Sequence, residues 1–115
     1  MTKLQDITVR PLVKKVEKKP GCIQSALGIL GDKWSPILLG HLFEEPKTFG
    51  DLTGALAGIS PRTLSARLDC LESDGIISKK LYCQHPPRYK YTLTKKGQDL
   101  RTILTQMANW GQKYS

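Results

Sequence analysis

Few cysteines and no long apolar run are found in this chain of 115 residues. The three cysteines are odd in number and widely spaced, which excludes a disulfide framework as the basis of the fold. No stretch approaches the roughly 18 consecutive apolar residues of a membrane-spanning helix, and no signal-peptide pattern opens the sequence. We therefore expect one cytoplasmic domain without a membrane partner.

The motifs of common enzyme classes are also missing. The sequence has no glycine-rich phosphate loop and no Ser/His/Asp set in a fitting context. Glu44 and Glu45 precede a proline at an expected helix end, where a solvated pair is the simplest interpretation. Cys83 and His85 could supply two metal ligands, but a structural zinc site needs four, and His41 is expected to cap or pack on a helix. We expect neither an enzyme nor a bound metal or cofactor.

Positive charge is in excess and unevenly placed. Eighteen lysines and arginines oppose ten acidic residues, which gives a net charge of +8. Residues 1–20 hold six basic and two acidic residues, and residues 76–97 hold six basic residues and no acidic one. The six positive charges in 76–97 repel one another unless an anion lies nearby, and the DNA phosphate backbone is the obvious candidate.

A helix is expected to begin after Ser60, which can cap it, with a proline in its first turn. Three leucines at helical spacing would face inward: Leu64, Leu68 and Leu71. A DNA major groove can accept the polar front of such a helix, and the residues expected to face DNA are Ser60, Arg62, Thr63, Ser65, Ala66 and Arg67. A tight turn at 57–59 joins this helix to a short one before it, as in a helix-turn-helix.

A basic β-hairpin is expected over residues 76–94, with period-two alternation in its second strand. Residues 83–87 are expected to leave the strands, because proline donates no ladder hydrogen bond. Four basic residues of this wing are expected to contact DNA: Lys79, Lys80, Arg88 and Lys90. The alternative is a winged-helix module that binds protein or RNA without operator specificity. However, RNA duplexes hide their deep groove from a helix, and a protein-binding module needs no such basic wing.

Two helices and a short extended piece are expected before this motif. The first helix spans 22–30, with an inward face of Ile23, Ala26, Leu27 and Leu30. The second has an apolar stripe of Trp34, Ile37, Leu38 and Leu42. Its cap is either Asp32, or Ser35 with Pro36 in the first position, and the second choice is less strained. An extended piece at 47–49 and a helix at 51–56 follow, with Leu52, Leu56 and Phe49 inward.

One helix is expected from Lys95 to Lys113, capped by Thr94. Its apolar residues repeat at spacings of three and four, which is typical of a helix–helix seam: Leu100, Ile103, Leu104, Met107, Trp110 and Tyr114. The seam could pack on the chain's own core. We favour a dimer interface, because so small a body cannot bury every apolar side chain. A homodimer would present two recognition helices to two half-sites of double-stranded operator DNA.

From Cys22 to the C-terminus the sequence resembles the HxlR-type winged helix-turn-helix regulators, a group related to the MarR-like proteins. The resemblance rests on motifs in a fixed order, namely Cys22, 31–34, 49–52, 58–60, Leu64, Arg67, Leu68, Leu71, 74–77, Tyr82, 86–87, 91–97 and 110–111. It implies a mostly helical α+β fold and a homodimeric transcriptional regulator, with a repressor as our expectation. It also implies that the helix after Ser60 enters the major groove and that the first and last helices form the dimer contacts.

Two features stay open at this point. Residues 1–20 are expected to form a flexible basic arm before a domain spanning 21–115, and the arm is either a solvated tail or a contact to DNA or the partner subunit. Some family members sense oxidants or electrophiles through a cysteine at the position of Cys22, which is followed by a helix start and preceded by Lys18 and Lys19. Such surroundings favour a thiolate. Cys22 is therefore either a redox sensor or a structural residue. Cys70 is expected to be half-buried and Cys83 exposed.

Overall fold

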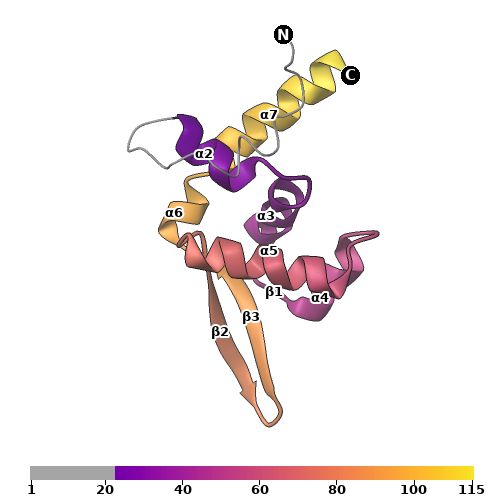
Figure 1. The fold of residues 1–115 in the computed structure, drawn as a ribbon, viewed down its shortest axis with the longest axis vertical. Helices are drawn as coiled ribbons and strands as arrows, with labels where there is room; N and C mark the ends of the chain where they lie inside the picture. Colours follow the sequence, from indigo (N-terminus) through magenta and orange to yellow (C-terminus); the bar gives the residue numbers. More distant parts are fainter. Residues whose placement is uncertain (1–22) are drawn as a thin grey trace. The chain divides into compact units, whose positions relative to one another are not determined.

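The computed structural model describes residues 23–115. The chain divides into two compact units, residues 1–36 and 37–115. The expected arm and Cys22 lie outside the described residues. The elements are α2 (Ile23–Leu30), α3 (Ser35–Glu44), β1 (Lys47–Thr48), α4 (Phe49–Ala55), α5 (Pro61–Ser73), β2 (Ile77–Gln84), β3 (Pro87–Leu93), α6 (Lys95–Gln98) and α7 (Arg101–Tyr114) (Figure 1).

Helix α2 presents a different face to the protein interior from the one expected. Ile29 is buried, whereas Ile23 is 75% exposed and Leu27 is 44% exposed. Each residue advances a helix by about 100°, so Ile23 and Leu27 lie on one stripe, turned away from Ile29. The expected inward face was therefore wrong for these two residues, and they form an exposed apolar pair.

The start of α3 is organised by Asp32. Its carboxylate accepts the backbone N–H groups of Trp34 and Ser35, both at 2.8 Å, and the Ser35 hydroxyl at 2.6 Å. Ser35 is thus the first helical residue and Pro36 the second, one residue later in the helix than expected. Pro36 causes no loss there, because first-turn amides have no partner within the helix.

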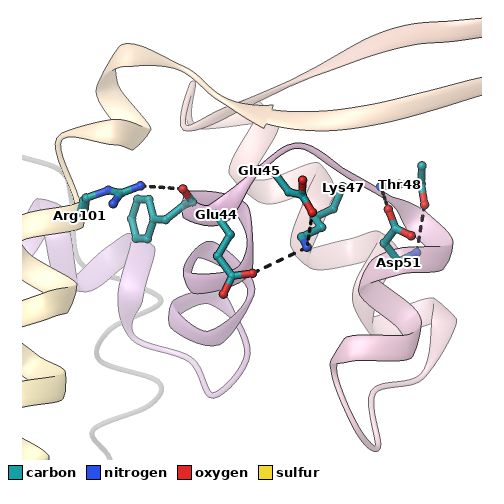
Figure 2. Close-up of polar contacts among 7 residues, drawn as sticks. Glu44, Glu45, Lys47, Thr48, Asp51 and Arg101 are labelled. Atoms are coloured by element: carbon teal, nitrogen blue, oxygen red, sulfur yellow. Dashed lines mark hydrogen bonds and ion pairs between the residues drawn. The ribbon is translucent and has the colours of Figure 1, made fainter.

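The second unit contains the rest of α3, which buries Leu38, Leu39 and Leu42. Ile37 was expected in this stripe, but it is 47% exposed. The three leucines define the centre of the buried face, and Ile37 lies about 100° or more from each of them around the helix. At the end of α3, Glu44 and Glu45 stay exposed as expected but share the Lys47 ammonium, at 3.8 and 3.3 Å (Figure 2).

Helix α4 begins with a capping box. The Asp51 N–H donates to the Thr48 hydroxyl and the Thr48 N–H donates to the Asp51 carboxylate, both at 3.0 Å (Figure 2). The hydrogen bond with the Thr48 backbone lowers the pKa of Asp51, and the hydrogen bond with the Thr48 side chain lowers it by a smaller amount. Gly58 then adopts a φ of 87° in the turn to α5, a conformation that glycine tolerates best. The expected two short helices and tight turn are confirmed.

Both ends of α5 are closed by local signals. Ser60 caps its start by accepting the Thr63 N–H at 3.0 Å, and Leu64, Leu68 and Leu71 are buried as expected. At the other end Gly75 has a φ of 75°. Its N–H bonds to the Glu72 carbonyl, and the next N–H, from Ile76, bonds to Leu71. This pair of bonds is the Schellman motif.

The hairpin lies where it was expected, but its strands extend further toward the turn. The three strands are ordered β1-β3-β2, with Gln84 paired to Pro87, so only His85 and Pro86 lie between the strands. The expected loop over 83–87 was too wide. Cys83 and Gln84 continue β2, and Pro87 is tolerated as the first residue of its strand. Tyr82 is an extra residue between the pairs made by Leu81 and Cys83, which forms a bulge.

The expected single C-terminal helix is two helices. α6 is short and α7 begins at Arg101, after a turn in which the Leu100 N–H bonds to the Gly97 carbonyl. Asp99 and Leu100 have ψ values of −14° and −12°, closer to zero than the ψ of about −42° in an α-helix. Leu100 is 8% exposed, so burial of this side chain accompanies the change of direction. Its expected place in an intermolecular seam was therefore wrong.

The core of residues 37–115 combines α3, α4 and α5 with the base of the hairpin, where Ile76, Ile77 and Leu93 are buried. The expected mostly helical α+β winged helix-turn-helix fold is confirmed. Across the described residues 23–115, no helix is long and apolar enough to cross a bilayer.

Candidate nucleic-acid interface

The N-terminal half of α5 presents the residues expected to read DNA. Arg62, Ser65 and Ala66 are exposed. Arg62 and Ala66 lie on the side of the helix opposite its buried leucines, and Ser65 lies on the flank. Ser60 and Thr63 are joined by a hydroxyl–hydroxyl hydrogen bond of 2.9 Å, in which Ser60 donates. The Thr63 hydroxyl proton is therefore available for an acceptor on a base or a phosphate. Arg67 is half-buried, so it is less accessible than expected.

The C-terminal half of α5 has the opposite charge. Asp69 and Glu72 are exposed there, and both lie close enough to Tyr91 of β3 to influence its pKa. Burial is the main reason why the pKa of Tyr91 is raised. Carboxylates repel phosphate, so the first two turns of α5 are the part suited to DNA.

The hairpin brings three of the four expected basic residues onto one face. Lys80 pairs directly with Lys90, and Arg88 lies two residues from Lys90 along β3, so all three share a face. Like charges directly opposite each other destabilise a sheet. Within the described part of the chain, no carboxylate forms an ion pair with any of them. This face is therefore an exposed cationic surface, which we call the wing cation face: Lys80, Arg88 and Lys90.

Lys79 lies on the other face of the hairpin. It pairs with Tyr91, and its ammonium sits 4.9 Å from the centre of the Tyr89 ring. Alternation along β2 separates neighbouring residues by face, so Lys79 and Lys80 cannot both meet one flat surface. In the sequence the two lysines look equivalent, because both are basic and adjacent.

An aromatic hollow of about 340 Å³ lies beside Arg88, between the start of α4 and the outer part of the hairpin. It is lined by Thr48, Phe49, Gly50, Tyr82, Pro87, Arg88, Tyr89 and Tyr91. Sequence reasoning missed this group, because it comes from two segments about 30 residues apart. The tyrosine alternation in β3 was visible in the sequence, but the position of α4 beside it was not.

The exposures of two cysteines are the reverse of those expected. Cys70 is exposed, because it lies about 200° around α5 from the buried Leu68. Cys83 is half-buried, with its sulfur 3.9 Å from the His85 carbonyl oxygen. In residues 23–115, no three side chains of His, Cys, Asp or Glu are grouped so that they could hold a metal.

Helix α7 has no buried residue. Its apolar side chains Ile103, Met107, Trp110 and Tyr114 are 44%, 53%, 68% and 63% exposed. The rings of Trp110 and Tyr114 lie 5.2 Å apart, and Leu104 beside them is half-buried. A contiguous exposed apolar stripe of this kind is typical of a protein–protein contact. We call Ile103, Met107, Trp110 and Tyr114 the α7 stripe.

Comparison with known proteins agrees with this geometry. A family model described as HxlR-like helix-turn-helix matches residues 29–115. The chain belongs to the HxlR family. It is therefore a helix-turn-helix transcriptional regulator, and DNA binding is the shared property of its group.

Among its relatives is the HTH-type transcriptional regulator YdeP of Bacillus subtilis, which is 39% identical over 95 residues, covering 82% of this chain and 74% of YdeP. The redox regulator HypR in its reduced form has a TM-score of 0.76 at 35% identity, over 79% of this chain and 90% of HypR. Reduced YodB from B. subtilis has a TM-score of 0.73 at 30% identity, over 85% of this chain and 95% of YodB. YodB has also been solved in a quinone-bound form. The relatives are described as regulators, not as enzymes.

Proposed function

We propose that this HxlR-family regulator is a homodimeric repressor that inserts the first turns of α5 into the major groove of operator DNA. The observation that carries this proposal is the exposed Arg62, which lies in the first turn of the helix capped by Ser60 and in the same compact unit as the wing cation face. Repression is the simpler mode, because a dimer bound over a promoter excludes other proteins without a further contact surface.

The homodimer is supported by the α7 stripe, which has no cover within the described chain. The apolar pair Ile23 and Leu27 on α2 is exposed as well. Two protomers joined through such surfaces would present two copies of α5 to half-sites about one helical turn of DNA apart. We further propose that residues 21–115 act as the DNA-binding domain and residues 1–20 as a basic arm.

Arg62 and Arg88 are expected to contact different parts of the DNA. A recognition helix places its N-terminal residues against base edges, so Arg62→Ala should cost about 1–3 kcal/mol on the operator and weaken preference at one base position. Arg88→Ala should weaken binding to all duplexes to a similar degree, because a wing cation meets phosphate or the minor groove. Competition binding on selected operator duplex and on random duplex measures both effects.

Lys33→Gln is the control, since it removes one exposed positive charge far in sequence from both α5 and the hairpin and should leave both affinities unchanged. The proposed division of work fails if Arg62→Ala and Arg88→Ala lose the same affinity on operator and on random DNA. An RNA duplex as competitor tests the alternative of an RNA-binding module, which predicts that RNA displaces the operator.

We also propose that regulation includes oxidation of Cys22. The support is that HypR is described as a redox regulator and that YodB was solved with a quinone. Cys22 immediately precedes α2, and Lys18 and Lys19 are close in sequence. A helix N-terminus and neighbouring ammonium groups both favour the reactive thiolate.

A quinone or hypochlorite is therefore expected to modify Cys22 before Cys70 and Cys83, and to change operator affinity. Cys22→Ser should abolish the response while leaving the affinity of untreated protein nearly intact. The measurement pairs site occupancy by mass spectrometry with DNA affinity over one oxidant titration. Cys70 is a sharp internal comparison, because it is exposed on α5 itself. Earlier reaction at Cys70 or Cys83, or full modification of Cys22 without a change in affinity, would show that Cys22 is structural.

A further inference from the structure

Arg101 links α7 to the end of α3. Its guanidinium Nη2 donates a hydrogen bond of 2.6 Å to the backbone carbonyl of Phe43 (Figure 2). The guanidinium carbon also lies 5.2 Å from the centre of the Phe43 ring. A planar cation can stack on a ring and donate to a carbonyl at the same time, which an ammonium group does less well. The two partners are 58 residues apart in sequence.

α6, by contrast, is hydrogen-bonded to the residues that follow α5, at positions 74–76. The Thr94 hydroxyl donates to the carbonyls of Gly75 and Ile76, at 2.6 and 3.0 Å, and the Lys96 ammonium donates to the Asp74 carbonyl at 2.8 Å. Gly97 is buried against the backbone of Ile76, where the Cβ of any other residue would overlap the Ile76 carbonyl. α6 therefore keeps a fixed position relative to the recognition helix.

The direction of α7 is determined by the residues that follow α6. The chain turns at Asp99 and Leu100, and no residue of α7 is buried. Within the described residues, Arg101 is the α7 residue whose side chain hydrogen-bonds to another element. The bond is made at the last turn of α3, where the carbonyls lack helical partners and favour a cation.

We propose that Arg101 is a positioning residue that fixes the angle between α7 and α5, and so determines the half-site spacing that the regulator accepts. This inference rests on the proposed function, in which α7 carries the dimer contact and α5 reads DNA. In a symmetric dimer, any change in the angle between α7 and α5 occurs in both protomers. It therefore changes the separation of the two recognition helices. Arg101 itself need not touch the DNA.

The angle can be measured without DNA. Spin labels at Glu72→Cys on α5 and Gln112→Cys on α7 report the α5–α7 distance in a background of Cys22→Ser, Cys70→Ser and Cys83→Ser. Dilution with unlabelled protein leaves only distances within one protomer. The otherwise unmutated protein should give one narrow distribution. Arg101→Gln should give a distribution about twice as wide, because α7 then samples several directions. A distribution with unchanged mean and width overturns the proposal.

DNA binding supplies the second readout. Duplexes with two copies of a selected half-site are compared at centre-to-centre spacings around one helical turn, together with a duplex that holds a single half-site. Arg101→Gln should weaken binding at the preferred spacing about tenfold, which corresponds to about 1.4 kcal/mol. It should flatten the spacing preference and leave single half-site binding unchanged. Phe43→Leu, which keeps the carbonyl but removes the ring, should give a smaller change in the same direction.

The controls separate positioning from charge. Lys33→Gln removes an exposed positive charge outside α5, α7 and the hairpin without touching Phe43, and it should leave the distance distribution and the spacing profile unchanged. Arg101→Lys keeps the charge and a donor, and it should restore part of the spacing preference. If Arg101→Gln instead weakens single and double half-sites equally, Arg101 is a phosphate contact and the proposal is wrong. If the unmutated protein neither dimerises nor binds DNA, the proposed function fails, and the distance measurement still judges the role of Arg101.

Discussion

Replacing Trp110 by alanine is expected to weaken the homodimer about 1,000-fold while the protomer stays folded. The indole is 68% exposed in the single chain, so its loss leaves no cavity in the core. A buried tryptophan at an interface contributes about 2 kcal/mol or more, and a symmetric dimer contains it twice, which gives about 4 kcal/mol. Sedimentation or light scattering over a range of concentrations measures the dissociation constant, and thermal unfolding at low concentration measures the protomer.

Gln112→Ala is the matched control. Gln112 is also exposed on α7, about 200° around the helix from Trp110, and its truncation should not change the dissociation constant. An unchanged dimer in Trp110→Ala would show that the α7 stripe is not the interface. A protomer that unfolds on this substitution would show that Trp110 packs within its own chain. Unmutated protein that is a monomer at micromolar concentration would remove the dimer from the proposal altogether.

Operator affinity is expected to fall about 10⁴-fold between 50 and 200 mM salt. If a dimer neutralises roughly eight phosphates, the slope of log affinity against log salt is about −7, because each contact releases a counterion. Two copies of the wing cation face supply six of these charges, and one basic residue of the proposed arm (residues 1–20) in each protomer would bring the number to eight. Titrations of one operator duplex at five or six salt concentrations measure the slope.

Arg88→Gln should make the slope shallower by about two in the dimer, one for each protomer. Lys33→Gln, outside α5, α7 and the hairpin, should leave the slope unchanged. A slope near zero for the unmutated protein would contradict DNA binding through the wing cation face. A steep slope that Arg88→Gln does not alter would mean that other cations, such as those of residues 1–20, make the phosphate contacts.

The helix-turn-helix could be derived from the sequence because its signals are local. The Ser60 cap and the period of Leu64, Leu68 and Leu71 operate within a few residues, and so does the glycine stop at Gly75. The cap and the glycine stop act through hydrogen bonds within one turn, and the leucine spacing matches the period of one helix. No contact with a distant segment is needed to recognise them. The excess of basic residues in the hairpin is likewise a property of composition, and the family resemblance follows from motifs in order along the chain.

Tertiary contacts decided the features that the sequence left open or predicted wrongly. Periodicity alone cannot say which side of a helix meets the core, so Ile23 and Ile37 were placed inward although they are exposed. At the break before α7, Leu100 is buried and Arg101 contacts Phe43, a residue far away in sequence. Neither contact can be read from the local sequence.

The wing shows the same limit on a smaller scale. Adjacent basic residues look equivalent in a sequence, but strand alternation puts Lys79 on one face and Lys80 on the other, beside Lys90 and Arg88. The sequence by itself therefore determined which elements form and that the hairpin is cationic, because short-range hydrogen bonds and composition govern both. Only the tertiary structure decided which side chains share a surface and in which direction α7 leaves the body, because these depend on pairings between segments far apart in the chain.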